Sequence, residues 1–371
     1  MKSINISAIN DLATDQRVHR MAESLAGEGY AVRLTGRRLG DCLLLTDLPF
    51  PVRRFQMVFT GGPLFYAFYN LRLFFYLLFL KRPALLVAVD LDTLPANYLV
   101  GRLRRIPLLY DSHEYFTEVP ELVDRRGVKR FWERIERRIV PKLQYAMAVS
   151  NSIAEVYTEK YGTPFVTVRN LARSYTPEPY PDFHKNYASK YKIIYQGALN
   201  IGRGIELMID AMAQMEDAVL FIAGDGDIRN ELERKVEKLG LRDRVVFTGR
   251  LFPGELQRIT PQCDLGLSLE EDLGLNYRMA LPNKVFDYIQ ARIPVLCSNL
   301  PEMSAIVHSY RVGEVCISRE PHQLANQLTG MLQDGDARKQ WECNLERAAE
   351  ELCWEREEQK LLGLVRSAMN E

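Results

Sequence analysis

The sequence predicts an α/β protein built from two doubly wound domains. The chain has 371 residues, more than one ordinary hydrophobic core organises, and 47% of them are hydrophobic against 26% charged. Short apolar runs alternate with helical patterns in both halves, which is typical of parallel sheets with helical crossovers. A segment at 174–190, with three prolines and no periodicity, is predicted to link the two domains.

The first domain is predicted over residues 1–173. Thr14 is the expected N-cap of its first helix, and Gly27 begins the stop signal. One face of that helix is apolar, formed by Val18, Met21, Ala22 and Leu25. The strands are predicted from four apolar runs, at 31–36, 84–89, 106–110 and 146–150.

The second domain is predicted over residues 191–350, with five apolar strands at 192–197, 218–224, 244–249, 265–269 and 293–297. The first three of these runs end in glycine, namely Gly197, Gly224 and Gly249. In a doubly wound sheet, ligands lie at the carboxyl ends of the strands, where small residues let backbone N–H groups approach a phosphate. This half therefore predicts a nucleotide site.

A glycine-rich turn follows Gly197 and leads through Arg203 into a helix. Free amides, a helix N-terminus and a guanidinium together suit a diphosphate. The alternative is an ordinary strand–turn–helix with a solvated arginine.

A second helix is predicted to start near Pro282, which places Asn283 and Lys284 at its positive end and Asp287 one turn further on. We expect Lys284 to meet a phosphate and Asp287 to accept both ribose hydroxyls. The alternative is a capped helix with a surface Lys284–Asp287 pair. The presence of several such turns in one half of the chain favours the nucleotide site.

In the first half, His113 lies just beyond a predicted strand, between Asp111 and Glu114. A histidine there can hydrogen-bond a sugar hydroxyl and respond to charge that develops during a reaction. The alternative is a loop histidine held by neighbouring carboxylates. Asp15 and Arg17 are interpreted either as substrate contacts or as a helix cap and a surface charge.

The charge of the chain is unevenly distributed. Residues 1–180 hold 25 Lys and Arg against 18 Asp and Glu, a balance of +7, and the remainder balances it at −7. The helical pattern at 125–142 has basic residues around an apolar stripe, which is typical of a helix at a membrane surface, although a core-packed helix with a solvated basic face fits equally. The apolar segment at 62–83 is not expected to cross a bilayer, because Asn70 and Arg72 lie near its centre.

Six scattered cysteines form no CxxC pattern and no cluster with histidine, which argues against a disulfide framework or structural zinc. The first residues show no apolar signal region. Together these observations predict a cytoplasmic protein.

The residues quoted above resemble glycosyltransferase family 4, the GT-B enzymes that use sugar nucleotides. The most specific block runs from AGDGD at 223–227 to RVVFTG at 244–249, and 195–212 and 281–296 also resemble the family. The segments 9–38 and 110–116 resemble its acceptor-side domain. The resemblance covers nearly the whole chain.

This resemblance implies two Rossmann-like domains facing across a cleft, with a final helix at 351–371 that crosses back to the first domain. The second domain would bind the nucleotide sugar and the first the acceptor. The family also implies retention of anomeric configuration. Neither a metal nor another cofactor is expected.

The resemblance implies a donor-site role for individual residues of this sequence. Arg203 occupies the place of the family's diphosphate-binding lysine, and Asp287 that of the second glutamate of its carboxylate pair. Lys284 is expected to supply the charge that the family has after the first glycine, where Ala198 stands here. The remaining donor contacts are predicted to be Gly197, Gly224, Gly226, Arg250 and Asn283.

On the other side, His113 matches the histidine that reaches the donor sugar and the reacting bond. Together with Arg203 and Lys284 it makes up the predicted catalytic set. The predicted acceptor-side residues are Asp15, Arg17, Asp111 and Glu114.

The first glutamate of the family's carboxylate pair is displaced. Family spacing puts it at Met279, which has no carboxylate. Glu271 lies upstream in a similar turn, and we interpret it as the first carboxylate, separated from Asp287 by an insertion. The alternative is that this role is lost.

Two other motifs have weaker support. Asp90 and Asp92 form the D-x-D spacing with which GT-A transferases bind a divalent ion, but the nucleotide-type turns lie in the other half. We therefore expect this pair to be acceptor-facing or structural. The GDGD at 224–227 lacks the third glycine of a dinucleotide fingerprint, which makes a nicotinamide dehydrogenase improbable.

The expected function is that of a hexosyltransferase-type glycosyltransferase. It would move sugar from a UDP-, GDP- or ADP-linked donor to a glycan or lipid-linked acceptor in polysaccharide or lipopolysaccharide synthesis, in contact with the anionic inner face of the cell membrane. Two alternatives are a GT-B sugar-nucleotide epimerase and a non-catalytic, membrane-associated GT-B binding protein, which Met279 favours. Nucleic acid is not an expected partner.

Overall fold

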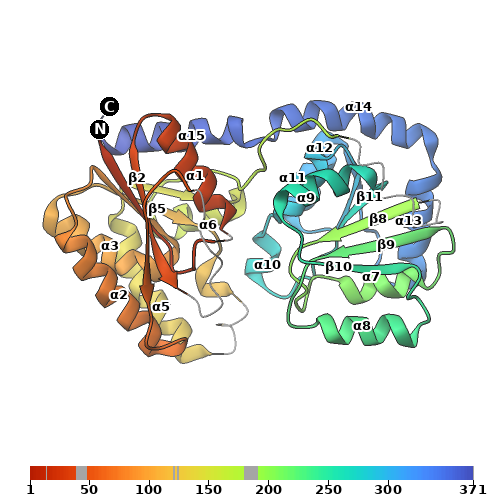
Figure 1. Cartoon of the computed structure of the whole chain (residues 1–371), viewed down its shortest axis with the longest axis horizontal. Coiled ribbons are helices and arrows are strands. Elements are labelled where there is room, and N and C mark those ends of the chain that lie inside the picture. The colour runs from red at the N-terminus through yellow and green to blue at the C-terminus, as the bar shows by residue number, and fades with distance from the viewer. Residues whose placement is uncertain (14, 39–47, 120–121, 123–124, 179–190, 371) are drawn as a thin grey trace. The chain divides into compact units, whose positions relative to one another are not determined.

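The computed structural model describes residues 1–13, 15–38, 48–119, 122, 125–178 and 191–370 (Figure 1). Contacts divide the chain into two compact units: Met1–Asn170 together with Arg356–Glu371, and Leu171–Glu355. Each unit is a parallel sheet with helical crossovers, which confirms the predicted α/β class. Most of the predicted linker, and Thr14, lie outside the described residues.

The sheet of the first unit has seven strands in the order β3-β2-β1-β4-β5-β6-β7. Their bounds are β1 Ser3–Ser7, β2 Ala31–Arg38, β3 Val52–Gln56, β4 Leu85–Val89, β5 Leu108–Ser112, β6 Tyr145–Ala148 and β7 Phe165–Thr167. All neighbours pair in parallel. The four predicted strands are present, whereas β1, β3 and β7 were not predicted because they are short or carry polar residues on alternate positions.

Figure 1 shows α2, α3 and α5 on one side of this sheet and α1 with α15 on the other. The helices are α1 Gln16–Gly27, α2 Gly62–Phe79, α3 Asp90–Arg104, α5 Arg126–Ile139, α6 Asn151–Tyr161 and α15 Trp354–Ala368. Short 3₁₀ turns lie at Phe116–Glu118 and Val140–Lys142. The predicted apolar face of α1 is buried, and Asp15 caps it by accepting a hydrogen bond from the Val18 N–H.

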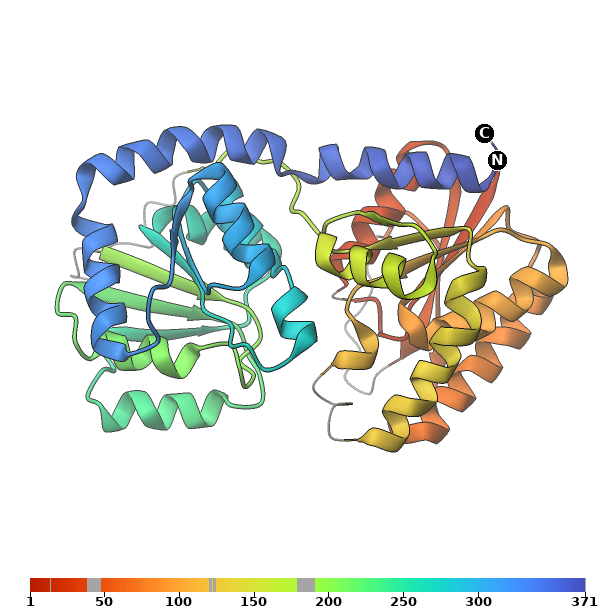
Figure 2. The same cartoon turned by 180° about the vertical axis from the view of Figure 1, so that it is seen from behind.

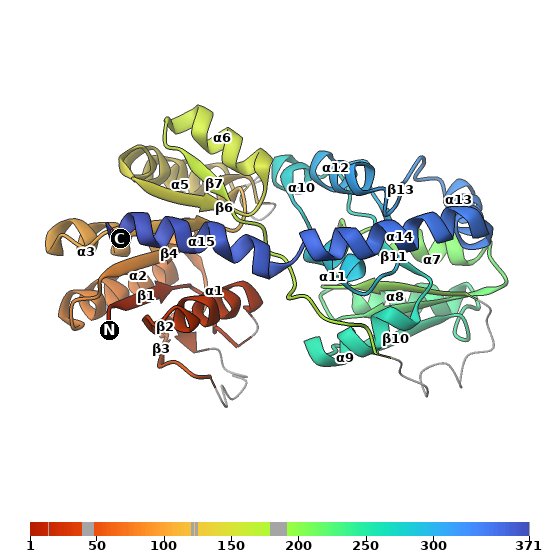
Figure 3. The same ribbon diagram turned by 90° about the horizontal axis from the view of Figure 1, so that it is seen from above.

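The last helix, α15, completes the first unit, as Figure 3 shows. The Ser24 hydroxyl of α1 donates to Glu358 at 2.6 Å, and Arg366 pairs with Glu28 at 2.5 Å. Leu361 and Val365 are fully buried. Helix α15 therefore packs as part of the first unit, although the residues of that unit that precede it in the chain lie within Met1–Asn170.

The second unit has six parallel strands in the order β10-β9-β8-β11-β12-β13 (Figure 2). They are β8 Tyr191–Gln196, β9 Ala218–Ala223, β10 Val245–Gly249, β11 Leu265–Ser268, β12 Val295–Cys297 and β13 Gly313–Val315. The helices are α7 Ile205–Met212, α8 Arg229–Lys238, α9 Pro253–Ile259, α10 Leu275–Met279, α11 Asn283–Gln290, α12 Pro301–Tyr310, α13 Pro321–Gln333 and α14 Gly335–Glu351, with a 3₁₀ turn at Thr260–Gln262. All five predicted strands are found here.

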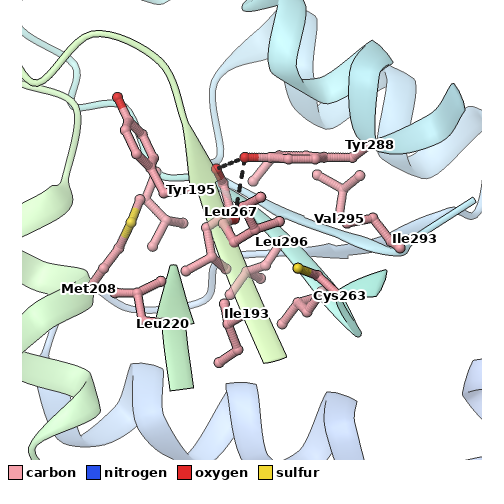
Figure 4. Close-up of a cluster of buried hydrophobic side chains, with 14 of the residues drawn as sticks. Ile193, Tyr195, Met208, Leu220, Cys263, Leu267, Tyr288, Ile293, Val295 and Leu296 are labelled. Carbon is pink, nitrogen blue, oxygen red and sulfur yellow. Dashed lines mark hydrogen bonds between the residues drawn. The ribbon is translucent and has the colours of Figure 1, made fainter. Parts of the chain in front are cut away.

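The Tyr288 hydroxyl of α11 forms hydrogen bonds to two neighbouring strands in the middle of this second sheet, β8 and β11 (Figure 4). This hydroxyl lies 3.1 Å from the Leu267 carbonyl oxygen of β11 and 3.3 Å from that of Ile194 in β8. It also accepts a hydrogen bond from the Gln196 N–H at 3.1 Å. A Cβ on Gly266 would lie 2.4 Å from the Tyr288 ring, so a glycine is required there. This packing fixes α11 against β8 and β11.

The apolar segment at 62–83 forms α2, which ends at Phe79. Within the described part of the chain, no helix has the length and apolar character needed to cross a membrane.

Candidate functional site

The strand order of each sheet reverses direction once, between β1 and β4 in the first unit and between β8 and β11 in the second. Ligands of open α/β sheets bind outside the carboxyl ends of the strands at such a switch point. Gly197 follows β8 directly, and Glu270 lies two residues beyond β11. Gly197, a predicted donor residue, and Glu270 therefore both lie at the switch point of the second sheet.

Three glycines are required at this edge, one by its backbone conformation and two by close backbone packing. Gly197 has φ 142°, a conformation that L side chains rarely adopt. A Cβ on Gly224 would lie 1.8 Å from the Gly197 carbonyl oxygen, and one on Gly226 would lie 2.5 Å from that of Leu199. The turns after β8 and β9 thus touch through their backbones.

We expect Gly224→Ala to destabilise the protein by about 1–3 kcal/mol, because the added methyl group forces these two turns apart. Thermal unfolding measures the loss. Gly254→Ala is the matched control, since nothing lies within 4 Å of the added Cβ. Equal melting temperatures for both variants would contradict the close packing of these turns.

Two cations share one buried carboxylate beside the glycine turns. The Lys284 Nζ lies 2.7 Å from the Glu270 Oε1, and the Arg203 Nη1 lies 3.9 Å from the same oxygen. The side chains of Lys284 and Glu270 are 8% and 2% exposed, and that of Arg203 is 31% exposed. The alternative of a surface Lys284–Asp287 pair is therefore wrong. Two cationic side chains thus face one carboxylate in this cluster.

Glu270 is a site residue that the sequence analysis missed. Burial favours its neutral form, but the ammonium of Lys284 and the hydrogen bonds that the carboxylate accepts lower its pKa overall, so it is ionised. The Ser268 hydroxyl donates to Glu270 at 2.8 Å. The predicted Glu271 instead lies 39% exposed, with Arg319 at 3.3 Å. Successive side chains of an extended segment point to opposite faces, which brings Ser268 and Glu270 to the same side.

Asp287 is held by a buried chain of hydrogen bonds. The Gln196 side-chain Nε2 donates to the Asp287 Oδ2 at 2.8 Å, and the Thr260 hydroxyl donates to the Gln196 Oε1 at 3.0 Å. Gln196 and Thr260 were not predicted as supporting residues. Arg250 and Asn283 are exposed, and within the described ranges no hydrogen bond joins either of them to Lys284.

In the first unit, Arg17 and Asp111 form a buried ion pair. The Arg17 guanidinium donates to both carboxylate oxygens of Asp111, at 2.7 and 3.0 Å, and to the Val168 carbonyl oxygen at 2.8 Å. The two side chains are 2% and 0% exposed. Burial favours the neutral acid, but Arg17 and His113 hold the pKa of Asp111 well below its usual range. Arg17 is therefore not a surface charge, which corrects one of the two interpretations above.

His113 lies between two carboxylates. Its Nε2 is 2.8 Å from the Asp111 Oδ2, and its backbone N–H donates to the Asp90 Oδ1 at 2.8 Å. Burial opposes the charged form, yet Asp111 and Asp90 raise the pKa of His113 to about 9. The ring is therefore an imidazolium at neutral pH. It can donate a hydrogen bond but has no lone pair with which to accept a proton.

The other predicted acceptor-side residues have different surroundings. Asp15 caps α1 and accepts a hydrogen bond from Asn10 at 2.6 Å. Glu114 is exposed, and its carbonyl oxygen accepts from the Ser112 hydroxyl at 2.8 Å. A contact of either residue with an acceptor stays a prediction. Among the residues that the structure describes, no group of three or more His, Cys, Asp or Glu side chains is arranged to hold a metal ion.

Comparison with known proteins adds family relationships to this geometry. The family model "Glycosyl transferases group 1" matches residues 178–347, and "Glycosyl transferase 4-like domain" matches residues 14–171. α-D-Kanosaminyltransferase of Streptomyces kanamyceticus is 22% identical over 260 residues, covering 65% of each chain. α-Monoglucosyldiacylglycerol synthase of Streptococcus pneumoniae is 22% identical over 211 residues, covering 56% of this chain and 42% of the relative. The chain thus spans less than two thirds of the length of either relative.

Among solved structures, the Anabaena protein HepE in complex with UDP and glucose is similar with a TM-score of 0.75. It is 16% identical, and the likeness covers 99% of this chain and 100% of HepE. At that identity the likeness shows the fold alone. The two family models together span both compact units. The chain therefore belongs to the glycosyl transferases of group 1 and has their two-domain α/β GT-B fold.

Proposed function

We propose that this protein transfers a sugar from a nucleoside diphosphate to an acceptor hydroxyl in the synthesis of a cell-surface glycan, lipopolysaccharide or glycolipid. The observation that carries the proposal is the pair of cations, Arg203 and Lys284, at the switch point of the second sheet beside the turns at Gly197 and Gly224. The presence of UDP in the HepE structure supports a nucleotide donor.

The chemistry follows from where charge develops. When the bond between the sugar and the diphosphate breaks, negative charge grows on the departing phosphate oxygens. Fixed cations at that position stabilise the transition state more than the ground state. Arg203 and Lys284 would supply this charge, and Asp287 would hold the ribose. Retention of configuration is the outcome that the family resemblance favours.

His113 would act in the same reaction as a charged hydrogen-bond donor to the sugar. Its position between Asp111 and Asp90 keeps the ring protonated. An imidazolium can stabilise negative charge on a sugar or phosphate oxygen, but it cannot remove the proton of the acceptor hydroxyl. We therefore assign electrostatic stabilisation, and not base catalysis, to His113.

Incubation of the protein with UDP-, GDP- and ADP-sugars tests the proposal. Slow release of the nucleoside diphosphate, accelerated by glycan or lipid acceptors, is the expected result. An isomerised sugar nucleotide would indicate an epimerase instead. The absence of both turnover and nucleotide binding would overturn the proposal.

We also propose that the first unit contacts an anionic membrane through α2, α3 and α5. These helices leave large apolar side chains exposed, among them Leu71, Phe75, Phe79, Leu99, Leu103 and Phe131. Their exposed charges are basic, on Arg102 of α3 and on Arg126, Arg130, Arg134, Arg137 and Arg138 of α5. The Asp and Glu residues of these three helices, which the structure describes throughout, are buried or half-buried. Apolar and basic groups on one surface suit an anionic bilayer.

The apolar stripe predicted on α5 is divided between two roles. Trp132 and Ile139 are buried and serve as the core contact, whereas Phe131 is 55% exposed. Only the exposed part is available to a membrane. An inner-leaflet location would place the enzyme beside a lipid-linked acceptor.

Flotation with liposomes tests the membrane contact. We expect co-flotation with vesicles that contain phosphatidylglycerol and little with phosphatidylcholine alone, because the basic residues need an anionic surface. Replacing Arg130, Arg134 and Arg137 by glutamine should abolish the difference. Arg234→Gln on α8, in the other unit, is the control. Equal recovery with both lipids would contradict the proposal.

A further inference from the structure

Asp90 begins α3 with a backbone conformation that is rare for a side chain with a Cβ. Its φ is 57°, in the left-handed region. Aspartate is among the few non-glycine residues that tolerate this region, and such strain persists only where the surroundings enforce it. The residue follows β4 directly, next to the switch point of the first sheet. It is also one half of the D-x-D pattern, to which the donor chemistry assigns no role.

The left-handed turn aims the Asp90 carboxylate at His113. Oδ1 accepts the backbone N–H of His113 at 2.8 Å, and Oδ2 lies 3.9 Å from the Nδ1 of the ring. Asp111 accepts from the opposite ring nitrogen, Nε2, at 2.8 Å. The result is a row of alternating charges, Arg17, Asp111, His113 and Asp90, that crosses α1, β5 and α3.

The exposed fraction of the side chains increases along this row from Arg17 and Asp111 to His113 and Asp90. Arg17 and Asp111 are buried, His113 is 18% exposed, and the Asp90 side chain is 24% exposed. The inner pair therefore anchors the row, and the outer pair lies where a substrate can reach it.

We propose that Asp90 is a positioning residue, whose carboxylate fixes both the backbone and the ring of His113 and keeps that ring charged toward the sugar substrate. This inference rests on the proposed role of His113 in glycosyl transfer. It also gives the first aspartate of the D-x-D pattern a function that involves no metal ion. Asp90 acts on the reaction only through His113.

The electrostatics of the neighbourhood agree with this geometry. Burial opposes the charged ring most strongly and Arg17 also opposes it, whereas Asp111 and Asp90 favour it. Burial raises the pKa of Asp90, His113 lowers it, and Asp111 together with Asp15 at the N-terminus of α1 raises it. The pKa of His113 is raised to about 9 from 6.5, so its charge stabilises the fold fully below pH 6.5. That contribution is lost as the pH rises through about 9.

Two substitutions distinguish the effect of the Asp90 carboxylate from the effect of its backbone conformation. Asp90→Asn keeps a residue that tolerates the left-handed region and an oxygen for the His113 N–H, but it removes the negative charge. Asp90→Gly keeps only the backbone freedom. If Asp90 merely closes the turn, both variants should behave as the wild type.

NMR titration of the His113 ring decides between these roles. The signal is assigned by its loss in His113→Gln and needs no substrate. We expect the pKa of His113 to fall below about 9 in both Asp90 variants. The alkaline limb of the pH–activity profile should move to lower pH by the same amount. Asp92→Asn is the control, because burial raises the pKa of Asp92 and leaves it little charge to remove.

An unchanged pKa of His113 in Asp90→Gly would overturn the proposal, and so would a lowered pKa with an unmoved pH–activity profile. Failure of the proposed function is distinguishable. In that case the His113 signal still shifts, while the wild type releases no nucleoside diphosphate from any sugar nucleotide.

Discussion

Replacing Arg203 by glutamine is expected to lower the turnover of the sugar nucleotide by roughly 10²–10³-fold, because one fixed cation no longer meets the charge that develops on the diphosphate. Affinity for the free nucleoside diphosphate should fall as well, though by less, since the effect is largest in the transition state. Steady-state kinetics and calorimetric titration with UDP, GDP and ADP measure the two quantities.

The fold should tolerate this change. The Arg203 side chain is 31% exposed and lies 5.5 Å over the Tyr277 ring, so its removal opens no core cavity. Arg242→Gln is the matched control, because Arg242 lies in the same unit, is 72% exposed and pairs with Glu237. Wild-type turnover in Arg203→Gln would exclude the switch point as the diphosphate site.

Lys284 needs a different test because it neutralises a buried partner. Lys284→Met alone would leave the buried Glu270 charged with only the more distant Arg203 to balance it, so lost activity would not distinguish chemistry from misfolding. The double variant Lys284→Met with Glu270→Gln removes both charges and is the better test.

Replacing Arg17 by methionine should reduce the free energy of unfolding of the first unit by about 3–5 kcal/mol, the usual cost of breaking a buried ion pair from one side. The reason is that Asp111, which is fully buried, keeps its negative charge and loses two hydrogen bonds. Urea unfolding followed by amide hydrogen exchange in α1 and β5 measures the change.

Two further variants distinguish the ion pair from simple packing. Asp111→Asn in the Arg17→Met background should recover part of the loss, because it removes a buried carboxylate that only His113 would still balance. Arg102→Met on the exposed face of α3 is the control and should change stability little. If Arg17→Met and Arg102→Met were equally stable, the buried pair would not be needed for the fold.

The sequence predicts much of the fold because local patterns carry it. Each apolar run that was predicted as a strand is a strand, since a strand buried on both faces has continuous hydrophobic residues. The strand β3 was not predicted, because Arg53 and Arg54 interrupt its apolar pattern. The stop signal at Gly27 was found, because it depends on neighbours along the chain.

The candidate site is less accessible to sequence reasoning because its contacts join distant segments. Lys284 was selected, yet its partner Glu270 was not, since the choice between Glu270 and Glu271 depends on which face each side chain takes after β11. The alternation from Ser268 to Glu270 contains that signal. The burial of Arg17 beside Asp111, 94 positions later, has no counterpart in local sequence. The left-handed backbone conformation of Asp90 also has no counterpart in local sequence.

The placement of α15 sets the order in which the protein can be completed during synthesis. Domains generally fold as units while the chain emerges from the ribosome, N-terminal first. Here the later unit, Leu171–Glu355, is fully translated before Arg356–Glu371, which belong to the earlier one. The N-terminal unit therefore lacks α15 on the side of its sheet that carries α1 until the last helix leaves the exit tunnel. A fragment ending at Asn170 would keep that surface exposed, whereas a version with 356–371 supplied in trans could cover it.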